Sequence, residues 1–240
     1  MGELILCSHP IAAMPYYIDN ISLNVYSLEE LCYYIENHLY LIEADFMSEE
    51  LCLWIGQELD EKDLAQSLRS VLLGNGSLSD FTELILRSCG YCSEDTIRHI
   101  RSVLLDMQNK SVFECSKIRA DRYMESEKYV KAIHEYRKLL GMEEECKKNP
   151  VLEGNIRHNL GTACAELFLF DEAAANFLNA YRLNQNRESL AACMAACRLA
   201  KKTDILKKYK EEFHVSDEAF KSMSDQWNSV LKSEDILQKQ

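Results

Sequence analysis

Residues 158–184 constrain the fold of this chain more than any other stretch, because small and large residues recur in them at helical spacing. They read HNLGTACAELFLFDEAAANFLNAYRLN. Two helix axes approach to about 8–10 Å only where the side chains between them are small. We therefore predict two short helices folded into a hairpin. Gly161 and Ala173 allow the close approach, and Phe170 and Phe177 fill the space beside them.

The same pattern occurs upstream at a constant offset of 41 residues. Five positions match: Ala120 with Gly161, Tyr123 with Cys164, Tyr129 with Phe170, Ala132 with Ala173 and Tyr136 with Phe177. An offset of 34 residues places Ala195 on Gly161, but Lys207 then takes the place of Ala173. The offsets predict two helical hairpins and a partial third one. Further helices, including one over Ser216–Leu231, then cap the array up to residue 232, and residues 233–240 form a frayed tail.

The order of Leu-Gly, a large residue, and then Ala, Phe and Ala along residues 160–180 resembles that of a tetratricopeptide repeat (TPR). The resemblance covers residues 113–214 and does not extend into the first 110 residues. The upstream copy has seven residues more than a 34-residue repeat, and they lie around residues 141–155. The resemblance implies an all-α fold, with helical hairpins stacked as a short TPR-like solenoid that holds other proteins.

In TPR proteins the first helix of each repeat lines a concave groove, which some members use to grip the C-terminal carboxylate of a partner. The resemblance therefore implies a partner-binding groove lined by Lys117, Asp121, Asn155, His158, Asn159 and Thr162. Lys117 and Asn159 match positions of the carboxylate clamp. However, Asp121 stands where the clamp has Asn, and Ser189 and Cys193 replace its distal basic residues. We therefore expect polar contacts to an extended peptide in this groove, without the clamp.

The negative charge of the chain is confined to its first half. Residues 1–110 hold 18 acidic and 6 basic side chains, whereas residues 111–240 hold 21 of each. A net charge of −12 offers no basic surface for phosphate backbones or anionic lipids. We expect an acidic, Tyr-rich and mainly helical region over residues 1–110, distinct from the repeats over residues 111–232. The expected partner is a protein or peptide, of basic character where the acidic region takes part, and neither nucleic acid nor membrane.

The acidic region begins with two short β-prone segments, Glu3–Cys7 and Ile21–Tyr26, which suggest a small β-ribbon. Ser27-Leu-Glu-Glu has the pattern of a capping box, and the helix after it has an apolar face. Glu29 falls on the opposite, polar face. Tyr33 and Tyr40 lie along the edge of this helix and are an alternative interface, because tyrosine is enriched in protein interfaces. Further helices are predicted over Ser48–Leu59, Asp60–Leu73, Ser79–Ser88 and from Ser93 through Met107.

Cys89-Gly-Tyr-Cys92, ahead of a helix that begins near Ser93, is the best enzymatic candidate. A CxxC at a helix N-terminus can carry a thiolate, as in thioredoxin-like redox sites. Those sites lie on a βαβ scaffold, which this sequence does not predict. A zinc site needs two further ligands; His99 lies seven residues on, and a second CxxC is absent. We favour a helix that ends at Cys89-Gly90, with ordinary buried thiols.

The sequence therefore predicts a non-enzymatic adaptor or scaffold that binds a protein or peptide and needs no cofactor or metal. Ten cysteines without regular pairing and no secretion signal favour reduced thiols in the cytoplasm. No apolar run approaches the roughly 18 residues that span a membrane. Two alternatives stay open. One is a regulatory protein that senses a peptide and acts on a second protein, and the other is a thiol redox protein that uses Cys89 and Cys92.

Overall fold

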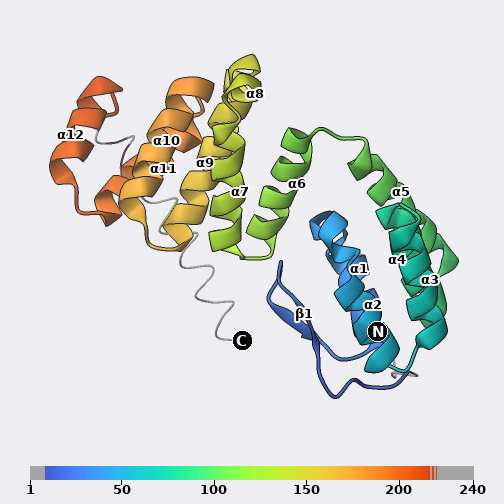
Figure 1. The fold of residues 1–240 in the computed structure, drawn as a ribbon. Helices are drawn as coiled ribbons and strands as arrows, with labels where there is room; N and C mark the ends of the chain where they lie inside the picture. The colour runs from blue at the N-terminus through green and yellow to red at the C-terminus, as the bar shows by residue number, and fades with distance from the viewer. Residues whose placement is uncertain (1–8, 217, 219, 221–240) are drawn as a thin grey trace. The chain divides into compact units, whose positions relative to one another are not determined.

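The computed structural model describes residues 9–216, 218 and 220, and it divides into two compact units, Met1–Cys115 and Ser116–Gln240. The described part holds twelve α-helices and one two-stranded sheet (Figure 1). The predicted all-α class is therefore confirmed. None of the described helices combines the length and the apolar composition needed to cross a lipid bilayer.

The first unit opens with a β-ribbon and continues as helices. Its elements are β1 (Tyr16–Ile18), β2 (Leu23–Val25), α1 (Leu28–Asn37), two short 3-10 helices (Leu39–Leu41 and Ala44–Phe46), α2 (Glu49–Gln57), α3 (Lys62–Leu73), α4 (Leu78–Cys89) and α5 (Glu94–Gln108). The helices over residues 48–107 thus lie where the sequence predicts them, to within a few residues.

The ribbon is present, but one of its strands differs from the expectation. β2 lies within the predicted segment Ile21–Tyr26, and it pairs antiparallel with β1, a strand that the sequence did not predict. A tight turn joins the two strands, in which the amide of Ser22 donates to the carbonyl of Asp19 and Ser22 has a φ of 55°. The predicted strand Glu3–Cys7 lies outside the described residues.

α1 begins at its predicted cap. The Ser27 hydroxyl accepts a hydrogen bond from the amide of Glu30 at 3.2 Å, and the Glu30 carboxylate reaches past Ser27 to the amide of Tyr26. The predicted apolar face, with Leu28 and Leu31 among its members, is fully buried. The prediction for Glu29 was wrong, because its side chain is buried against His9.

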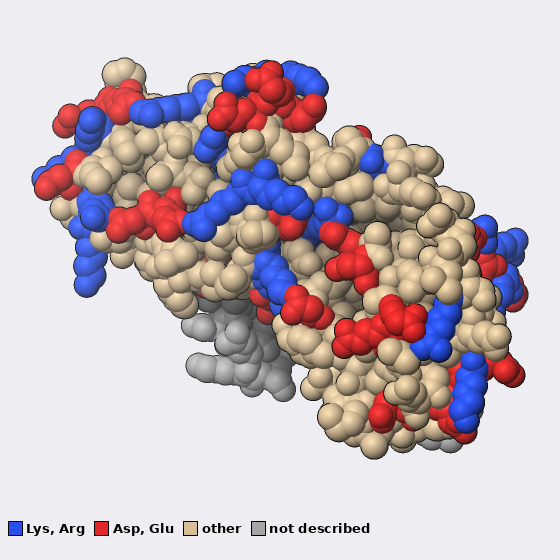
Figure 2. Space-filling view, viewed as in Figure 1, with Lys and Arg blue, Asp and Glu red and all other residues tan. Residues whose placement is uncertain are grey.

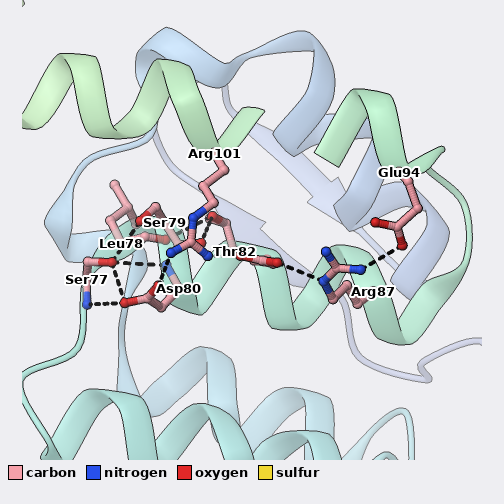
Figure 3. A network of polar contacts seen from close by, with 9 residues as sticks. Ser77, Leu78, Ser79, Asp80, Thr82, Arg87, Glu94 and Arg101 are labelled. Atoms are coloured by element: carbon pink, nitrogen blue, oxygen red, sulfur yellow. Dashed lines mark hydrogen bonds and ion pairs between the residues drawn. The ribbon is translucent and has the colours of Figure 1, made fainter. Parts of the chain in front are cut away.

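α4 and α5 are held together at their surface by a polar network (Figure 3). Ser77 caps α4 in a capping box with Asp80. From α5, Arg101 pairs with the other oxygen of the Asp80 carboxylate at 3.1 Å and also with Glu83. Arg87 then joins α4 to Glu94, in the first turn of α5, at 2.6 Å. The network fixes α5 against α4 just beyond the Cys89–Cys92 turn.

The second unit is a series of helices that lie side by side along the chain (Figure 1). They are α6 (Val112–Glu125), which begins in the first unit, α7 (Tyr129–Gly141), α8 (Glu143–Lys148), α9 (Pro150–Glu166), α10 (Phe170–Asn184), α11 (Arg187–Leu199) and α12 (Thr203–Glu212). The seven additional residues around residues 141–155 are accommodated by α8. Most of the helix predicted over Ser216–Leu231, and the tail after it, lie outside the described residues.

α9 and α10 form the predicted antiparallel hairpin, and two glycines bring them together. A Cβ atom built on Gly161 would lie 2.8 Å from two carbons of the Phe177 ring. One built on Gly154, two turns earlier, would lie 2.8 Å from the Cβ of Asn184, two turns later than Phe177. Ala173 is fully buried in the same interface. The small residues therefore set the close approach of these helices.

Ion pairs link neighbouring helices at the surface of the second unit. Arg137 of α7 pairs with Glu172 of α10 at 2.6 Å, and Arg182 of α10 pairs with Glu212 of α12 at 3.1 Å. Figure 2 shows basic and acidic side chains next to each other over this unit. Neither sign of charge dominates the face in view, which agrees with the equal numbers of acidic and basic residues in the sequence.

Candidate functional site

The second unit contains a cavity of about 360 Å³ among α9, α10 and α11. Its lining is mainly apolar, with two carboxylates and a few polar groups: His158, Thr162, Ala165, Glu166, Phe170, Phe177, Glu188, Ala191, Ala192, Ala196 and Leu199. The hollow follows from the sequence, because four alanines in the lining leave space that larger side chains would fill. Cavities of this kind, apolar with a few polar groups, are the usual form of ligand sites.

His158 is the most constrained polar residue of the cavity. Its Nδ1 lies 2.9 Å from the hydroxyl of Ser189, which is fully buried on α11. Its ring packs on the ring of Phe177, with the ring centroids 5.2 Å apart. Burial lowers the pKa of His158, and the nearby carboxylate of Glu188 opposes that shift. At neutral pH the imidazole is therefore uncharged, and it offers the cavity a hydrogen-bonding group in a fixed position.

The ionised side chains in the lining are both carboxylates, Glu166 on α9 and Glu188 on α11, and both are exposed. An apolar hollow beside exposed carboxylates suits a ligand with an apolar group next to a positive charge. The Ser189 hydroxyl that lies against His158 is fully buried and is not part of the cavity lining.

The six predicted groove residues are divided among three places. His158 and Thr162 line the cavity, where the Thr162 hydroxyl donates to the His158 carbonyl at 3.2 Å. Asn155 is exposed, and its side-chain oxygen accepts a hydrogen bond from Asn184 at 3.1 Å. The other three lie together in a separate cluster.

That cluster joins α6, α7 and α9. Asp121 forms an ion pair with Lys117, one turn earlier on α6, through one carboxylate oxygen. Its other oxygen accepts hydrogen bonds from the Tyr136 hydroxyl at 2.7 Å and from Asn159 at 3.3 Å. Burial, and then the hydrogen bond to Asp121, raise the pKa of Tyr136. These side chains are engaged with one another, so their evident role is to join three helices.

The alternative interface is partly exposed. Tyr33 projects from α1 with 54% of its surface exposed, whereas Tyr40 is half-buried in the 3-10 helix Leu39–Leu41. Of the two, Tyr33 is the more exposed.

The CxxC spans the turn between α4 and α5. Cys89 is the last residue of α4 and is buried, and Gly90 follows with a φ of 66°, the left-handed cap that ends many helices. Cys92 precedes Ser93, the cap of α5, and burial together with Glu36 and Cys89 raises its pKa to about 11. The better exposed of the two thiols is therefore protonated at neutral pH.

Cys89 nevertheless has neighbours that the sequence does not predict. Cys32 of α1 forms a hydrogen bond with it, which lowers the pKa of the Cys89 thiol and, with burial, raises that of Cys32. His9 and Glu29 also lie beside Cys89. The only signal in the sequence was the spacing of Glu29 and Cys32, which places them one turn apart on the same helix. By contrast, His99 is exposed and is not part of this group.

The described residues thus hold two arrangements that could bind a ligand: the cavity of α9, α10 and α11, and the cluster of polar side chains around Cys89. The cavity can receive an apolar group, and the cluster around Cys89 has side chains of the kinds that bind metal ions.

Comparison of the chain with protein-family models, with curated proteins and with solved structures gave no match.

Proposed function

We propose that this chain is a non-enzymatic, TPR-like interaction protein of the cytoplasm that binds a segment of a partner protein in the cavity of α9, α10 and α11. The observation that carries the proposal is the cavity itself, which is apolar, has His158 at its wall and has two exposed carboxylates beside it. The volume of about 360 Å³ is at the lower end for ligand sites and suits one large side chain of a peptide.

The charge of the chain favours a partner segment with basic residues. Glu166 and Glu188 would face a lysine or arginine next to the inserted apolar side chain. The net negative charge of residues 1–110 would attract the same partner at longer range, since attraction between oppositely charged surfaces raises the association rate. The net charge of −12 disfavours nucleic acid and anionic membranes as ligands. Nine described cysteines are free, which is consistent with a reducing compartment.

The proposal is tested with an array of short peptides, each carrying one Phe, Leu, Met or Trp between lysines, with glutamate-flanked copies as the charge control. We expect the full chain to bind a subset of the lysine-flanked peptides and none of the glutamate-flanked ones. Ala191→Phe, which fills the cavity from a half-buried lining position, should abolish that binding. Ala195→Phe is the matched control, because Ala195 is also half-buried on α11 but does not line the cavity.

Two outcomes would contradict the proposal. One is an array on which no lysine-flanked peptide binds. The other is binding that Ala191→Phe leaves at the level of the wild type.

A further inference from the structure

Among the described residues, His9, Glu29 and Cys89 form the one group of three potential metal ligands whose binding atoms all lie within 4.8 Å of one another. They come from three segments of the first unit: the stretch before β1, the first turn of α1 and the last turn of α4. Cys32, on the same side of α1 as Glu29, lies outside this 4.8 Å group but brings a second thiol beside it through its hydrogen bond with Cys89.

The fold holds these side chains in place before any ion is bound. Nδ1 of His9 lies 2.9 Å from Oε1 of Glu29, and the backbone amide of His9 donates to the same oxygen at 3.2 Å. The Cys32 thiol lies 3.9 Å from the carbonyl of Ile85, so α1 and α4 are packed together beside the group. Gly90 turns the chain away immediately after Cys89, which leaves that thiol at the end of its helix and facing α1.

The burial of the group calls for an explanation. Cys32 is fully buried, Glu29 is 6% exposed and Cys89 is 8% exposed, while the side chain of His9 is 19% exposed. A carboxylate seldom lies that deep unless it is paired or bound to a metal. His9 pairs with Glu29 in this buried position, and two thiols lie beside the pair. A divalent cation among all four groups would compensate the carboxylate and would use both thiols.

We propose that His9, Glu29, Cys32 and Cys89 bind one zinc ion. Zinc is held in proteins by cysteine sulfur, histidine nitrogen and carboxylate oxygen, almost always in a tetrahedron of four ligands when its role is structural. Sulfur ligands favour zinc over magnesium and calcium, which prefer oxygen. The four groups supply the complete tetrahedron from the protein, and their burial leaves no position for a substrate. The site is therefore a structural one.

Binding is balanced by the release of protons. The two thiols lose their protons to solvent and bind as thiolates, Glu29 binds as a carboxylate and His9 binds as a neutral imidazole. With zinc the group carries a net charge of −1. Zinc–sulfur bonds of about 2.3 Å and zinc–nitrogen bonds of about 2.0 Å place ligand atoms closer together than the 4.8 Å that holds for His9, Glu29 and Cys89, so rotations of these side chains, and of Cys32 from outside that limit, would complete the site.

Zinc would join the N-terminal stretch to α1 and α4. This function is separate from peptide binding, since all four ligands belong to the first unit and the cavity belongs to the second. Failure of one proposal therefore leaves the other standing.

The test uses the full chain, purified with reductant and zinc and then freed of unbound metal. We expect elemental analysis to find one zinc ion per chain. Cobalt, added to the metal-free chain, should give the absorption of a tetrahedral thiolate complex. Cys89→Ser and Cys32→Ser should each lower zinc affinity by more than about 100-fold, because the loss of even an outer partner costs about 10- to 100-fold.

Two matched controls separate ligation from the mere loss of a thiol. Cys92→Ser removes the other cysteine of the CxxC, which is outside the group, and Cys52→Ser removes a buried thiol elsewhere in the first unit. Both should retain one zinc ion per chain.

A measurement without variants covers the case in which Cys32→Ser or Cys89→Ser fails to fold. In the wild type, zinc should slow alkylation of Cys32 and Cys89 relative to the chelated chain, as followed by mass spectrometry, and leave the rate for Cys92 unchanged. The proposal is overturned by a wild type that binds no stoichiometric zinc, by a folded Cys89→Ser chain that binds it as tightly as the wild type, or by equal alkylation with and without zinc. A chain that lacks zinc and carries a Cys32–Cys89 disulfide overturns it in favour of a redox pair.

Discussion

Tyr136 of α7 donates its phenolic hydrogen to Asp121 of α6 across 2.7 Å, and the same carboxylate pairs with Lys117. Tyr136 is fully buried, whereas Lys117 is about one-third exposed. The loss of Asp121 would therefore cost more free energy at Tyr136 than at Lys117. A buried hydroxyl without an acceptor is costly, whereas a lysine that loses its partner turns to water.

We expect Asp121→Ala to lower the free energy of unfolding by about 1–3 kcal/mol, because it removes the short bond that the Tyr136 hydroxyl makes and leaves only the longer one with Asn159. Lys117→Ala should cost at most about 1 kcal/mol, the usual value of a partly solvated ion pair. Urea denaturation followed by circular dichroism measures both. Equal and small effects would mean that the cluster does not hold α6 to α7.

Gly161→Ala should destabilise the hairpin of α9 and α10. The new Cβ would lie 2.8 Å from the Phe177 ring, and overpacking of this kind costs about 1–3 kcal/mol, against a gain of about 1 kcal/mol in helix propensity. Gly141→Ala is the control, because nothing lies within 4 Å of its Cβ position at the end of α7. Melting temperatures should fall for Gly161→Ala and stay level or rise for Gly141→Ala. The same response in both would exclude close packing at Gly161 as the cause.

The second unit should lose stability in mild acid through His158. Its pKa is lowered in the folded state, so below the ordinary histidine value of about 6.5 the unfolded chain binds more protons than the folded one. The contribution of His158 is therefore complete above about pH 6.5 and is lost as the pH falls from there through the lowered pKa. Glu188 on α11 faces the ring and reduces the effect, and Phe177 and Ser189 add no charge.

Urea denaturation at a series of pH values between about 7.5 and 5 measures this slope. His158→Gln should flatten it, and His134→Gln, at an exposed position on α7, should leave it as in the wild type. If both variants keep the slope of the wild type, the acid sensitivity has another source.

Salt should slow the association of a basic peptide with this chain more than it speeds dissociation. Steering by exposed charges is screened over about 8 Å at physiological ionic strength and acts mainly on the association rate. Neutralising Asp45, Glu50 and Asp63, three exposed carboxylates of the first unit, should reduce that salt dependence. The dissociation rates of His158→Ala and Asn159→Ala, measured by stopped-flow kinetics, distinguish binding in the cavity from binding in the predicted groove. If the cavity is the site, only the former speeds dissociation. If the predicted groove is the site, both do.

The helices could be predicted because their signals are local. The apolar face of α1, the Ser27 cap and the Gly90 terminus each depend on residues within about two turns of one another. The hairpin of α9 and α10 was predictable for the same reason, since the small residues and Phe177 lie in one short stretch.

The rest depended on partners that are distant in the sequence. Glu29 matches a polar surface position by its spacing, but it is buried and pairs with His9, 20 residues earlier in the sequence. The side chains of Lys117 and Asp121 could be placed on one helix, but no local pattern predicts that Tyr136 donates a hydrogen bond to the Asp121 carboxylate. The cavity was missed as a whole, because it needs alanines from two helices around His158.

The Phe177 ring has Gly161 on one side and is part of the cavity wall on another. Its position therefore depends on a residue that does not itself line the cavity. Any side chain at residue 161 would displace the ring, and the depth available to a ligand would change without the alteration of a single lining residue. Related chains could thus acquire cavities of different depth through position 161 alone, while the lining keeps the same composition.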